Sequence, residues 1–510
     1  MKLSSPLTAR PLGPGEAAEA KPEAGRRRWI DSYWPLVGLV AISAVANFLF
    51  IGSQSLDVDE GYSVMVAKLS WSGLYDAMRH NNANMGLYYA LLHFWKGVGT
   101  SEAVLRAPSA VFAIATVPVV YWLGRRLFSA RVGALAGLLL AVNGFFVAFA
   151  QEARSYSLLL LLASLSSCFF VAAVERRSSR AWVGYAVVSC LAVGAHFFAV
   201  LVVLAHLLSL AFLPRRTYSR RAVAAALAAV AAVVGALVLV LNGTTLELSA
   251  LRRPGFRTII GTASALSGGG GIALLVVMAL ACGLALPTLA GVWRSGPRSP
   301  AMWRWALLVS WLVAPALLTL GMSAFQPAFL DRYLIVSLPP LVILAAIGLS
   351  SFGGRALAIA LAAVLVAGST WAMVRWDSRH PKHDLRGAVS FVLTRSRAGD
   401  GVAFQDRDVR DVFDYYLRRA DRPRPPVQLY DSTRPRWHAV LTTEEVERRL
   451  QGHDRVWLVL LSNRRSPSLI EQIDRIARFR AERRFPVAVV VRLYDVPSFL
   501  TSGARDLRLP

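Results

Sequence analysis

The sequence predicts a polytopic α-helical membrane protein with a small C-terminal α/β domain outside the membrane. Of its 510 residues, 55% are hydrophobic, the mean hydropathy is +0.47, and the apolar residues occur in long runs, which is too apolar for a soluble protein of this size. From residue 377 onward, charged residues become dense and the apolar runs shorten to strand length. The net charge of +25 comes largely from arginines that punctuate apolar runs, so membrane topology and anionic lipids explain it better than nucleic acid.

Two segments flank the first apolar run: a polar tail before it and an outer loop after it. Residues 1–33 are rich in Ala, Pro, Gly and Glu and contain Arg26–Arg28, so we interpret them as a disordered cytoplasmic tail. A cleaved signal peptide is the alternative for the first run, but cleavage would detach the acidic cluster that follows it. The outer loop over 52–103 contains a short apolar segment at 85–98, which we interpret as an interfacial or re-entrant helix.

We expect about eleven transmembrane helices, because each long apolar run approaches the roughly 20 residues that cross the hydrocarbon. The run over 181–213 is too long for one span and short for two, and we divide it near His196. The expected spans are 34–51, 104–124, 132–150, 155–174, 181–195, 197–213, 221–241, 271–293, 303–323, 333–351 and 355–374.

The positive-inside rule orients these spans. With the N-terminus in the cytoplasm, every expected inner segment is basic, and eight of the nine carboxylates between residues 33 and 374 lie outside. If 85–98 were a full span, Arg125, Arg126 and Arg131 would face outward. We therefore expect the C-terminus outside a bacterial cytoplasmic membrane.

The C-terminal region, 376–510, alternates strand-like and helix-like stretches, which is typical of a small α/β domain. No glycine-rich phosphate loop follows any of the strands, which disfavours a nucleotide site. The expected strands are 401–404, 427–430, 456–461 and 486–493, and the expected helices are 385–395, 408–419, 442–451 and 467–484.

The most informative polar feature is an acidic cluster at the mouth of the first span, Asp57, Asp59 and Glu60. Carboxylates in such a place usually serve chemistry or transport. One interpretation is structural: Asp59 caps a helix and Glu60 lies in its positive first turn. The other is a general base at the membrane surface, because partial shielding can raise a carboxyl pKa toward the working pH. In an extended loop, Asp57 and Asp59 would face the same way.

Other polar residues fall on the same outer face. Glu152 and Arg154 follow the third span, Arg106 lies near the start of the second, Asp331–Tyr333 opens a late span, and His196 separates two short ones. Each has a structural alternative, as a salt bridge, a snorkelling anchor or an interior polar group. Together they predict an outward-facing site with a base and an anion cradle, since arginine binds phosphate oxygens bidentately.

No metal site or cofactor is indicated. Cys168, Cys190 and Cys282 lie in apolar runs without pairing or ligand spacing, and we interpret them as core residues. His380 and His383 fall in a stretch that we interpret as a linker. Whether a divalent cation assists is left open.

Six short motifs occur in order between residues 59 and 334. They are Asp59-Glu60, Leu105-Arg106-Ala107-Pro108-Ser109, Gly124-Arg125-Arg126-Leu127-Phe128, the stretch from Gln151 to Leu158, His196 and Asp331-Arg332-Tyr333-Leu334. As an ordered set they resemble the family 39 glycosyltransferases. This family includes the dolichyl-phosphate-mannose protein mannosyltransferases and the lipid A aminoarabinose transferase, which share the GT-C membrane fold. The resemblance covers roughly residues 34–350 and is strongest over 57–160.

The resemblance implies an inverting glycosyltransferase that moves a sugar from a polyprenyl-phosphate donor to a hydroxyl of a cell-envelope glycan, lipid or protein. Asp59 matches the base on the acceptor hydroxyl, with Glu60 as its supporting neighbour, and Glu152 matches an acid that binds acceptor or donor. The remaining substrate-binding candidates within the matching motifs are Arg106, Arg154, Tyr156, His196, Arg332 and Tyr333, of which the arginines receive the lipid phosphate.

One segment departs from the family pattern. Many relatives carry Pro-Pro-Leu before the interfacial helix, whereas this chain has Asn84-Met85-Gly86-Leu87 there. A phosphate contact from that loop is therefore disfavoured. Two other functional classes are alternatives to a glycosyltransferase. A transporter or flippase would carry acids near mid-span and related repeats, which the sequence does not show. A non-catalytic scaffold would depend on its C-terminal domain and not on Asp59 or Glu152.

Overall fold

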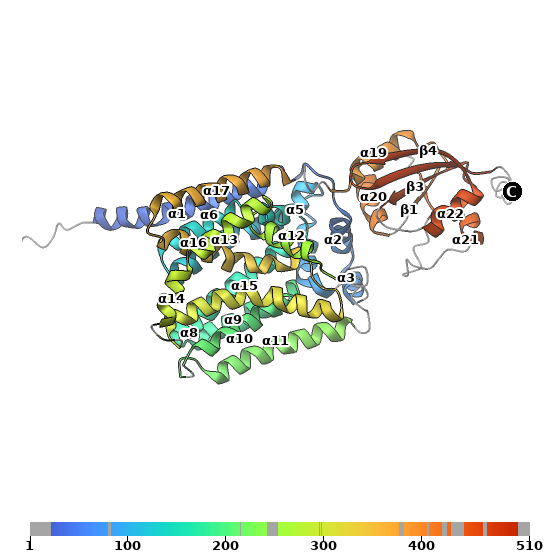
Figure 1. The fold of residues 1–510 in the computed structure, drawn as a ribbon. Helices are drawn as coiled ribbons and strands as arrows, with labels where there is room; N and C mark the ends of the chain where they lie inside the picture. The colour runs from blue at the N-terminus through green and yellow to red at the C-terminus, as the bar shows by residue number, and fades with distance from the viewer. Residues whose placement is uncertain are drawn as a thin grey trace, which may run out of the picture.

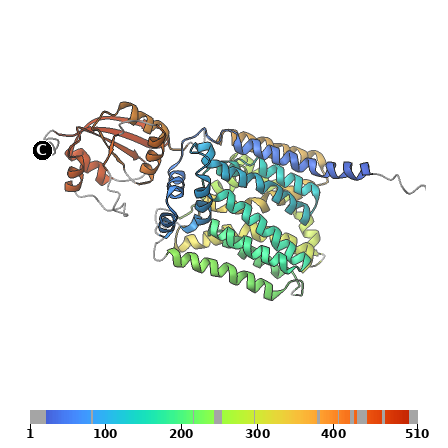
Figure 2. The ribbon, with the colours of Figure 1, turned by 180° about the vertical axis from the view of Figure 1, so that it is seen from behind.

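The computed structural model describes residues 22–79, 83–214, 216–241, 253–294, 296, 298–376, 382–404, 407–420, 426–429, 443–462 and 467–497. It is a bundle of long helices followed by a smaller region built around one sheet (Figure 1). The N-terminal end of α1 and the sheet region lie at opposite ends of the bundle in both views (Figures 1 and 2). The expected fold class, a polytopic helical membrane protein with a C-terminal α/β region, is confirmed at this level.

Seven helical segments in the described residues are long and apolar enough to cross a membrane, and an eighth is obtained if α6 and α7 form one bent span. Three shorter apolar helices, at Tyr33–Phe48, Ser179–Ala195 and Ala199–Phe212, complete the bundle. Its elements are α1 (Pro22–Phe48), α5 (Glu102–Leu127), α6 (Ala130–Ala141), α7 (Gly144–Ala150), α8 (Tyr156–Arg176), α9 (Ser179–Ala195), α10 (Ala199–Ser209), η3 (Leu210–Phe212), α11 (Arg220–Leu241), α13 (Ile272–Gly283), α14 (Leu286–Arg294), α15 (Pro300–Phe325), η4 (Asp331–Ser337), α16 (Leu338–Ser351) and α17 (Arg355–Val374).

Two breaks in the bundle have local causes. Between α6 and α7 the axis bends by 60°, and Asn143 caps α7 by accepting from the Phe146 N–H at 3.0 Å while donating to the Leu266 carbonyl at 2.9 Å. Between α9 and α10, His196 is extended, with φ −167° and ψ 131°. The expected division of 181–213 at His196 is thus confirmed.

Of two expectations at the N-terminal side, one needs adjustment and the other agrees with the structure. Residues 1–21 of the expected tail lie outside the described residues, and α1 already begins at Pro22, so the helix takes up the last part of the 1–33 segment. The segment 85–98 forms the short helix α4 (Gly86–Trp95), as expected for an interfacial element.

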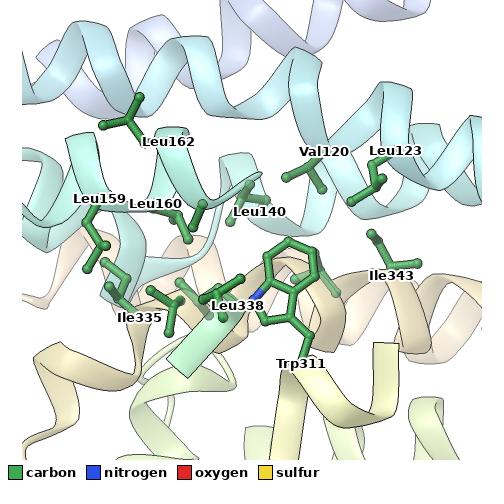
Figure 3. Close-up of a cluster of buried hydrophobic side chains, with 14 of the residues drawn as sticks. Val120, Leu123, Leu140, Leu159, Leu160, Leu162, Trp311, Ile335, Leu338 and Ile343 are labelled. Atoms are coloured by element: carbon green, nitrogen blue, oxygen red, sulfur yellow. The ribbon is translucent and has the colours of Figure 1, made fainter. Parts of the chain in front are cut away.

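Dense packing holds the bundle together, as it must where lipid surrounds the helices. The Trp311 ring lies among Leu338, Val120 and Leu140 in the core (Figure 3). Where α5 and α6 cross, Gly133 lies so close to the Tyr121 carbonyl that an added Cβ would overlap it. Small residues at such crossings let two helix backbones approach.

Several short helices form the end of the bundle that faces the sheet region (Figure 1). They are α2 (Val58–Lys68), α3 (Trp71–Ala77), η2 (Ala83–Met85), α4 and α12 (Phe256–Leu266).

The C-terminal region is a five-stranded mixed sheet in the order β2-β1-β3-β5-β4. Strand β1 is parallel to β2 and β3, while β5 is antiparallel to β3 and β4. The elements are α19 (Leu385–Arg395), β1 (Gly401–Phe404), α20 (Arg407–Arg419), β2 (Val427–Gln428), α21 (Thr443–Leu450), β3 (Arg455–Leu461), α22 (Pro467–Ile476), β4 (Arg478–Phe485) and β5 (Val489–Asp495).

One helix expected in this region is wrong in its second half. The stretch 467–484 divides into α22 and the edge strand β4, and β5 begins at Val489 instead of residue 486. A tight turn at Val487 and Ala488, both with positive φ, joins β4 to β5 as a hairpin. Pairing with β5 decides the strand, and the exposed arginines of β4 are typical of a protected sheet edge.

Candidate active site

The acidic cluster is organised by the start of helix α2. Asp57 is the N-cap: its carboxylate accepts from the Val58 N–H at 2.9 Å, and Glu60 Oε2 accepts from the Asp57 N–H at 3.1 Å, which completes a capping box. The helix therefore begins at Val58. The interpretation of Asp59 as the cap and the extended loop that would align Asp57 with Asp59 are both wrong.

Glu60 points into the protein and forms a buried ion pair with Arg106. Arg106 Nε donates to Glu60 Oε1 at 2.7 Å and its Nη2 donates to Oε2 at 2.9 Å, and both side chains are about 1–2% exposed. The other three guanidinium N–H groups donate to the carbonyls of Ile51, Gln54 and Ser55. All five donors of Arg106 are thus used to hold the loop before α2.

The surroundings of Glu60 keep it ionised. Burial by itself raises the pKa of this carboxyl, but the charges of Arg106 and Lys382, with hydrogen bonds from Arg106 and the Ala153 N–H, outweigh burial and hold the pKa well below its usual range. The Ala153 N–H donates to Glu60 Oε1 at 3.0 Å. Glu60 therefore links α2 to the loop between α7 and α8.

Asp59, one residue earlier, has the opposite environment. Its side chain is 42% exposed, and its Oδ2 lies 3.0 Å from Arg332 Nη1 and 3.9 Å from Arg154 Nη2. Arg154 also donates to the Asp59 carbonyl at 3.3 Å. From the sequence, we expected lipid and protein to shield this carboxylate partly from water. In the structure, it is partly exposed and lies beside two guanidinium groups.

Glu152, from the loop before α8, lies on the same side. Lys382 Nζ is 3.5 Å from Glu152 Oε1 and 2.9 Å from Glu60 Oε2. Burial raises the pKa of Glu152, Lys382 lowers it, and the charges of Glu60 and Asp57 raise it again, with a net upward shift. The charge of Glu152 thus depends on a balance between Lys382 and the surrounding acids.

Several of these groups line one cavity of about 290 Å³. The cavity brings together acids from α2, from the loop before α8 and from η4 with one guanidinium. Its lining residues are Asp57, Asp59, Glu60, Phe149, Glu152, Leu330, Asp331 and Arg332.

Three buried polar atoms around Asp59 have no hydrogen-bond partner among the described residues. They are the Tyr89 hydroxyl, Arg154 Nε and Arg332 Nε. The Arg154 guanidinium also lies over the Tyr156 ring, 5.8 Å from its centroid. Buried donors without partners are costly and rare in folded proteins. Three of them around one carboxylate indicate a place where a ligand supplies acceptor oxygens.

His196 and Tyr333 form the aromatic wall behind this place. The His196 ring is fully buried, lies 6.0 Å from the Tyr156 ring and 5.1 Å from the Tyr333 ring, and places Nε2 3.3 Å from Asn84 Nδ2. Burial, followed by the charges of Arg154 and Arg332, lowers the pKa of His196 to about 3. The ring is therefore neutral and shapes the wall.

Sequence reasoning missed two residues of the cluster, Lys382 and His383, which it assigned to a linker. His383 Nδ1 lies 2.6 Å from Asp57 Oδ1. The available signal was a lysine and two histidines directly after the last apolar run. Within the described ranges, no group of three or more His, Cys, Asp or Glu side chains could hold a metal ion.

Part of the chain is similar to a known family. Residues 85–241 match the family described as dolichyl-phosphate-mannose-protein mannosyltransferase. Over this stretch, the chain is similar to these membrane glycosyltransferases. The matched residues run from α4 through α11 and include the loop that carries Glu152 and Arg154. No curated protein sequence matches the chain.

Solved structures show that the fold extends over nearly the whole chain. ArnT from Cupriavidus metallidurans in the apo state matches with a TM-score of 0.62 and 12% identity, over 94% of this chain and 99% of ArnT. ArnT bound to undecaprenyl phosphate matches with a TM-score of 0.58 and 13% identity, over 90% and 97%. The oligosaccharyltransferase AglB from Archaeoglobus fulgidus, in complex with an inhibitory peptide and a dolichol-phosphate, matches at 0.52 and 11%, over 92% and 75%. The chain has the ArnT-like GT-C fold.

Proposed function

We propose that this protein is an inverting glycosyltransferase that moves a sugar from a polyprenyl-phosphate donor to an acceptor hydroxyl on the extracytoplasmic face. The observation that carries the proposal is the meeting of Asp59 with Arg154 and Arg332, beside a cavity that Asp59 and Arg332 line. The fold supports it, since ArnT and AglB, which share the fold, have structures with undecaprenyl phosphate and with a dolichol-phosphate.

Arg154 and Arg332 would receive the phosphate of the donor. Each has an Nε without a partner in the described chain, and both guanidinium groups turn toward Asp59. As the bond from the sugar to the phosphate breaks, negative charge grows on the phosphate oxygen. Cations that are already in place stabilise that charge without reorganisation. The Tyr89 hydroxyl offers one further donor at the same place.

Asp59 would act as the general base. One carboxylate oxygen takes the proton of the acceptor hydroxyl, the hydroxyl oxygen attacks the anomeric carbon, and polyprenyl phosphate leaves with the electron pair of the broken bond. A single displacement inverts the anomeric centre. The exposure of Asp59 at 42% leaves it accessible to an acceptor, whereas Glu60 is enclosed.

The remaining candidates take supporting roles in this proposal. Arg106 has no donor left for a phosphate, because Glu60 and three carbonyls use all five. Arg106 and Glu60 therefore position α2. Tyr156, His196 and Tyr333 shape the wall of the donor site, and Glu152 contacts the acceptor from the loop before α8.

We further propose eleven spans, with the N-terminus in the cytoplasm and residues 376–510 outside a bacterial cytoplasmic membrane. The eight longer candidates and the three shorter apolar helices give this number. An odd number agrees with the positions of α1 and the sheet region at opposite ends of the bundle (Figure 2). The transferase domain would then comprise 34–375.

The test is to supply membranes that contain the protein with radiolabelled polyprenyl-phosphate sugars and to follow transfer of label to cell-envelope material. Asp59→Asn should lower transfer by about 10²-fold or more, the usual contribution of a positioned base. Asp76→Asn, which changes a carboxylate on α3 outside the cavity lining, is the matched control and should keep its rate. Unchanged transfer in Asp59→Asn would remove the base assignment, and label that crosses the membrane without transfer would favour a flippase.

A further inference from the structure

A lysine from beyond the last membrane helix lies inside the acidic cluster. Lys382 precedes α19, yet its Nζ lies 2.9 Å from Glu60 Oε2 and 3.5 Å from Glu152 Oε1. Its side chain is 16% exposed, so the ammonium is largely removed from water. A buried lysine needs such carboxylates to remain charged.

The residues that follow Lys382 hold it in place. His383 Nδ1 contacts Asp57 Oδ1 at 2.6 Å. Arg386 donates through Nη2 to the Gly52 carbonyl at 3.3 Å and to the Gln54 carbonyl at 3.0 Å. The loop before α2 is thus held by Arg106 from the bundle and by Arg386 from the C-terminal region.

A wider contact fixes the C-terminal region to the outer end of the bundle. Arg386 and Arg419 lie 2.7 Å and 2.6 Å from the two oxygens of Glu102, at the start of α5. The Tyr416 hydroxyl accepts from the Leu56 N–H at 2.8 Å. Helix α20 packs directly on α2, where an added Cβ at Gly61 would overlap Val412. The position of Lys382 therefore follows from an extensive contact.

Lys382 is also the cation with the largest effect on Glu152. Burial and the charges of Glu60 and Asp57 favour its neutral form, and Lys382 is the nearest cation that opposes them. Arg106 already pairs with Glu60 through two hydrogen bonds, so Glu60 would stay ionised without Lys382. At Glu152, loss of Lys382 would shift the balance further toward the neutral form, because its remaining cationic neighbour, Arg332, has a smaller effect.

We propose that Lys382 is a positioning residue of the transferase site, which keeps Glu152 ionised and directed at the cavity so that Glu152 can accept a hydrogen bond from the acceptor. The inference rests on the proposed function and extends it: a C-terminal region that lies outside the helix bundle supplies a charge that the site needs. The acceptor site is complete only when this region is docked.

Several charged groups surround Glu152 and enter its titration. They come from α2, from the segment before α19, from α5 and from η4. They are Asp57, Asp59, Glu60, Arg106, Asp331, Arg332, Lys382 and His383.

The first measurement needs no substrate. Infrared difference spectra of the full-length protein in detergent, recorded against pH, follow the carbonyl band of protonated Glu152, which Glu152→Gln identifies by its absence. In Lys382→Met the band should appear at a pH about 1–3 units higher than in the wild type, the usual effect of removing a neighbouring opposite charge. Lys382→Arg should largely restore the wild-type curve. The same curve in wild type and Lys382→Met would overturn the proposal.

The matched control for docking is Arg419→Met. Arg419 pairs with Glu102 at the contact between the regions but does not line the cavity. It should leave the Glu152 titration where the wild type has it. A shift in Arg419→Met as large as in Lys382→Met would mean that docking alone, and not the lysine charge, sets the titration.

The second measurement is transfer as a function of pH. The acidic limb should move to higher pH in Lys382→Met, with a larger rise in the acceptor KM than fall in kcat, and this shift should vanish in the Glu152→Gln background. If the wild type transfers sugar and Lys382→Met keeps the limb and the KM, the inference fails while the proposed function stands. If no donor supports transfer, the proposed function fails, and the infrared titration still decides the charge coupling.

Discussion

Asp59 and Glu60 are neighbours in the sequence but have different roles, because both lie in the first turn of a helix, where successive side chains point in different directions. Successive residues of an α-helix point about 100° apart, so the first turn of α2 directs Asp59 to the cavity and Glu60 to Arg106. The N-cap at Asp57 fixes this phase.

At Glu60 we expect a large effect on stability. Glu60→Gln leaves the Arg106 guanidinium buried without its counter-charge, which costs about 3 kcal/mol or more. The pKa of Glu60 is lowered in the folded protein, so its stabilisation is fully present above the unfolded pKa of about 4.3 and is lost as pH falls through the folded pKa. In thermal unfolding in detergent, the Tm of the variant should lie well below that of the wild type at neutral pH. This difference in Tm should become smaller under strong acid. An equal Tm at pH 7 would contradict this.

At Arg332 we expect a binding defect. Arg332→Gln removes a guanidinium whose Nε has no partner in the described residues, and a charge-assisted hydrogen bond contributes about 1.5–3 kcal/mol. The Kd for polyprenyl phosphate should rise at least about tenfold, measured by the change in tryptophan fluorescence on titration. Arg355→Gln, at the start of α17 on the far end of the bundle, is the control and should bind normally. Equal affinity in both variants would exclude Arg332 from the phosphate site.

Among the elements, the contact between α2 and α20 is the tightest that involves the site. Gly61 has no room for a side chain because Val412 fills the space. Gly61→Val should push α2 away from α20, lower the Tm and expose the chain between α17 and α19 to protease. Gly38→Ala in α1, where an added Cβ meets nothing within 4 Å, should behave as the wild type in limited proteolysis. A protease-resistant Gly61→Val variant would show that α2 tolerates the displacement.

Some elements of the C-terminal region can be predicted from local sequence patterns and others cannot. Helix α19 and strand β1 were predicted with the bounds that the structure has, since each is a short amphipathic or apolar run between polar turns. Strand β4 was not, because Arg478–Phe485 carries few apolar residues and is a strand only through its pairing with β5. The contacts of Lys382 and His383 were missed for a related reason: these two residues gain partners from residues more than 300 positions away. His380, in the same expected linker, lies outside the described residues.

For the whole molecule, the arrangement predicts which surfaces face outward. In a variant whose three native cysteines are replaced, Glu444→Cys on α21 should react with an impermeant maleimide in intact cells. Arg180→Cys, an exposed position near the start of α9, should react only after the membrane is permeabilised. The reverse pattern of labelling would invert the proposed topology.

The sequence by itself determined the helical membrane class, the break at His196 and most of the C-terminal elements, because hydropathy and cap patterns are local properties of the chain. Only the tertiary structure decided which of these residues do what. Arg106 forms a buried ion pair with Glu60, whereas Arg154 and Arg332 both lie close to Asp59. Lys382 completes the cluster from the C-terminal region. Charge pairing depends on distances across the fold, and sequence spacing carries no information about those distances.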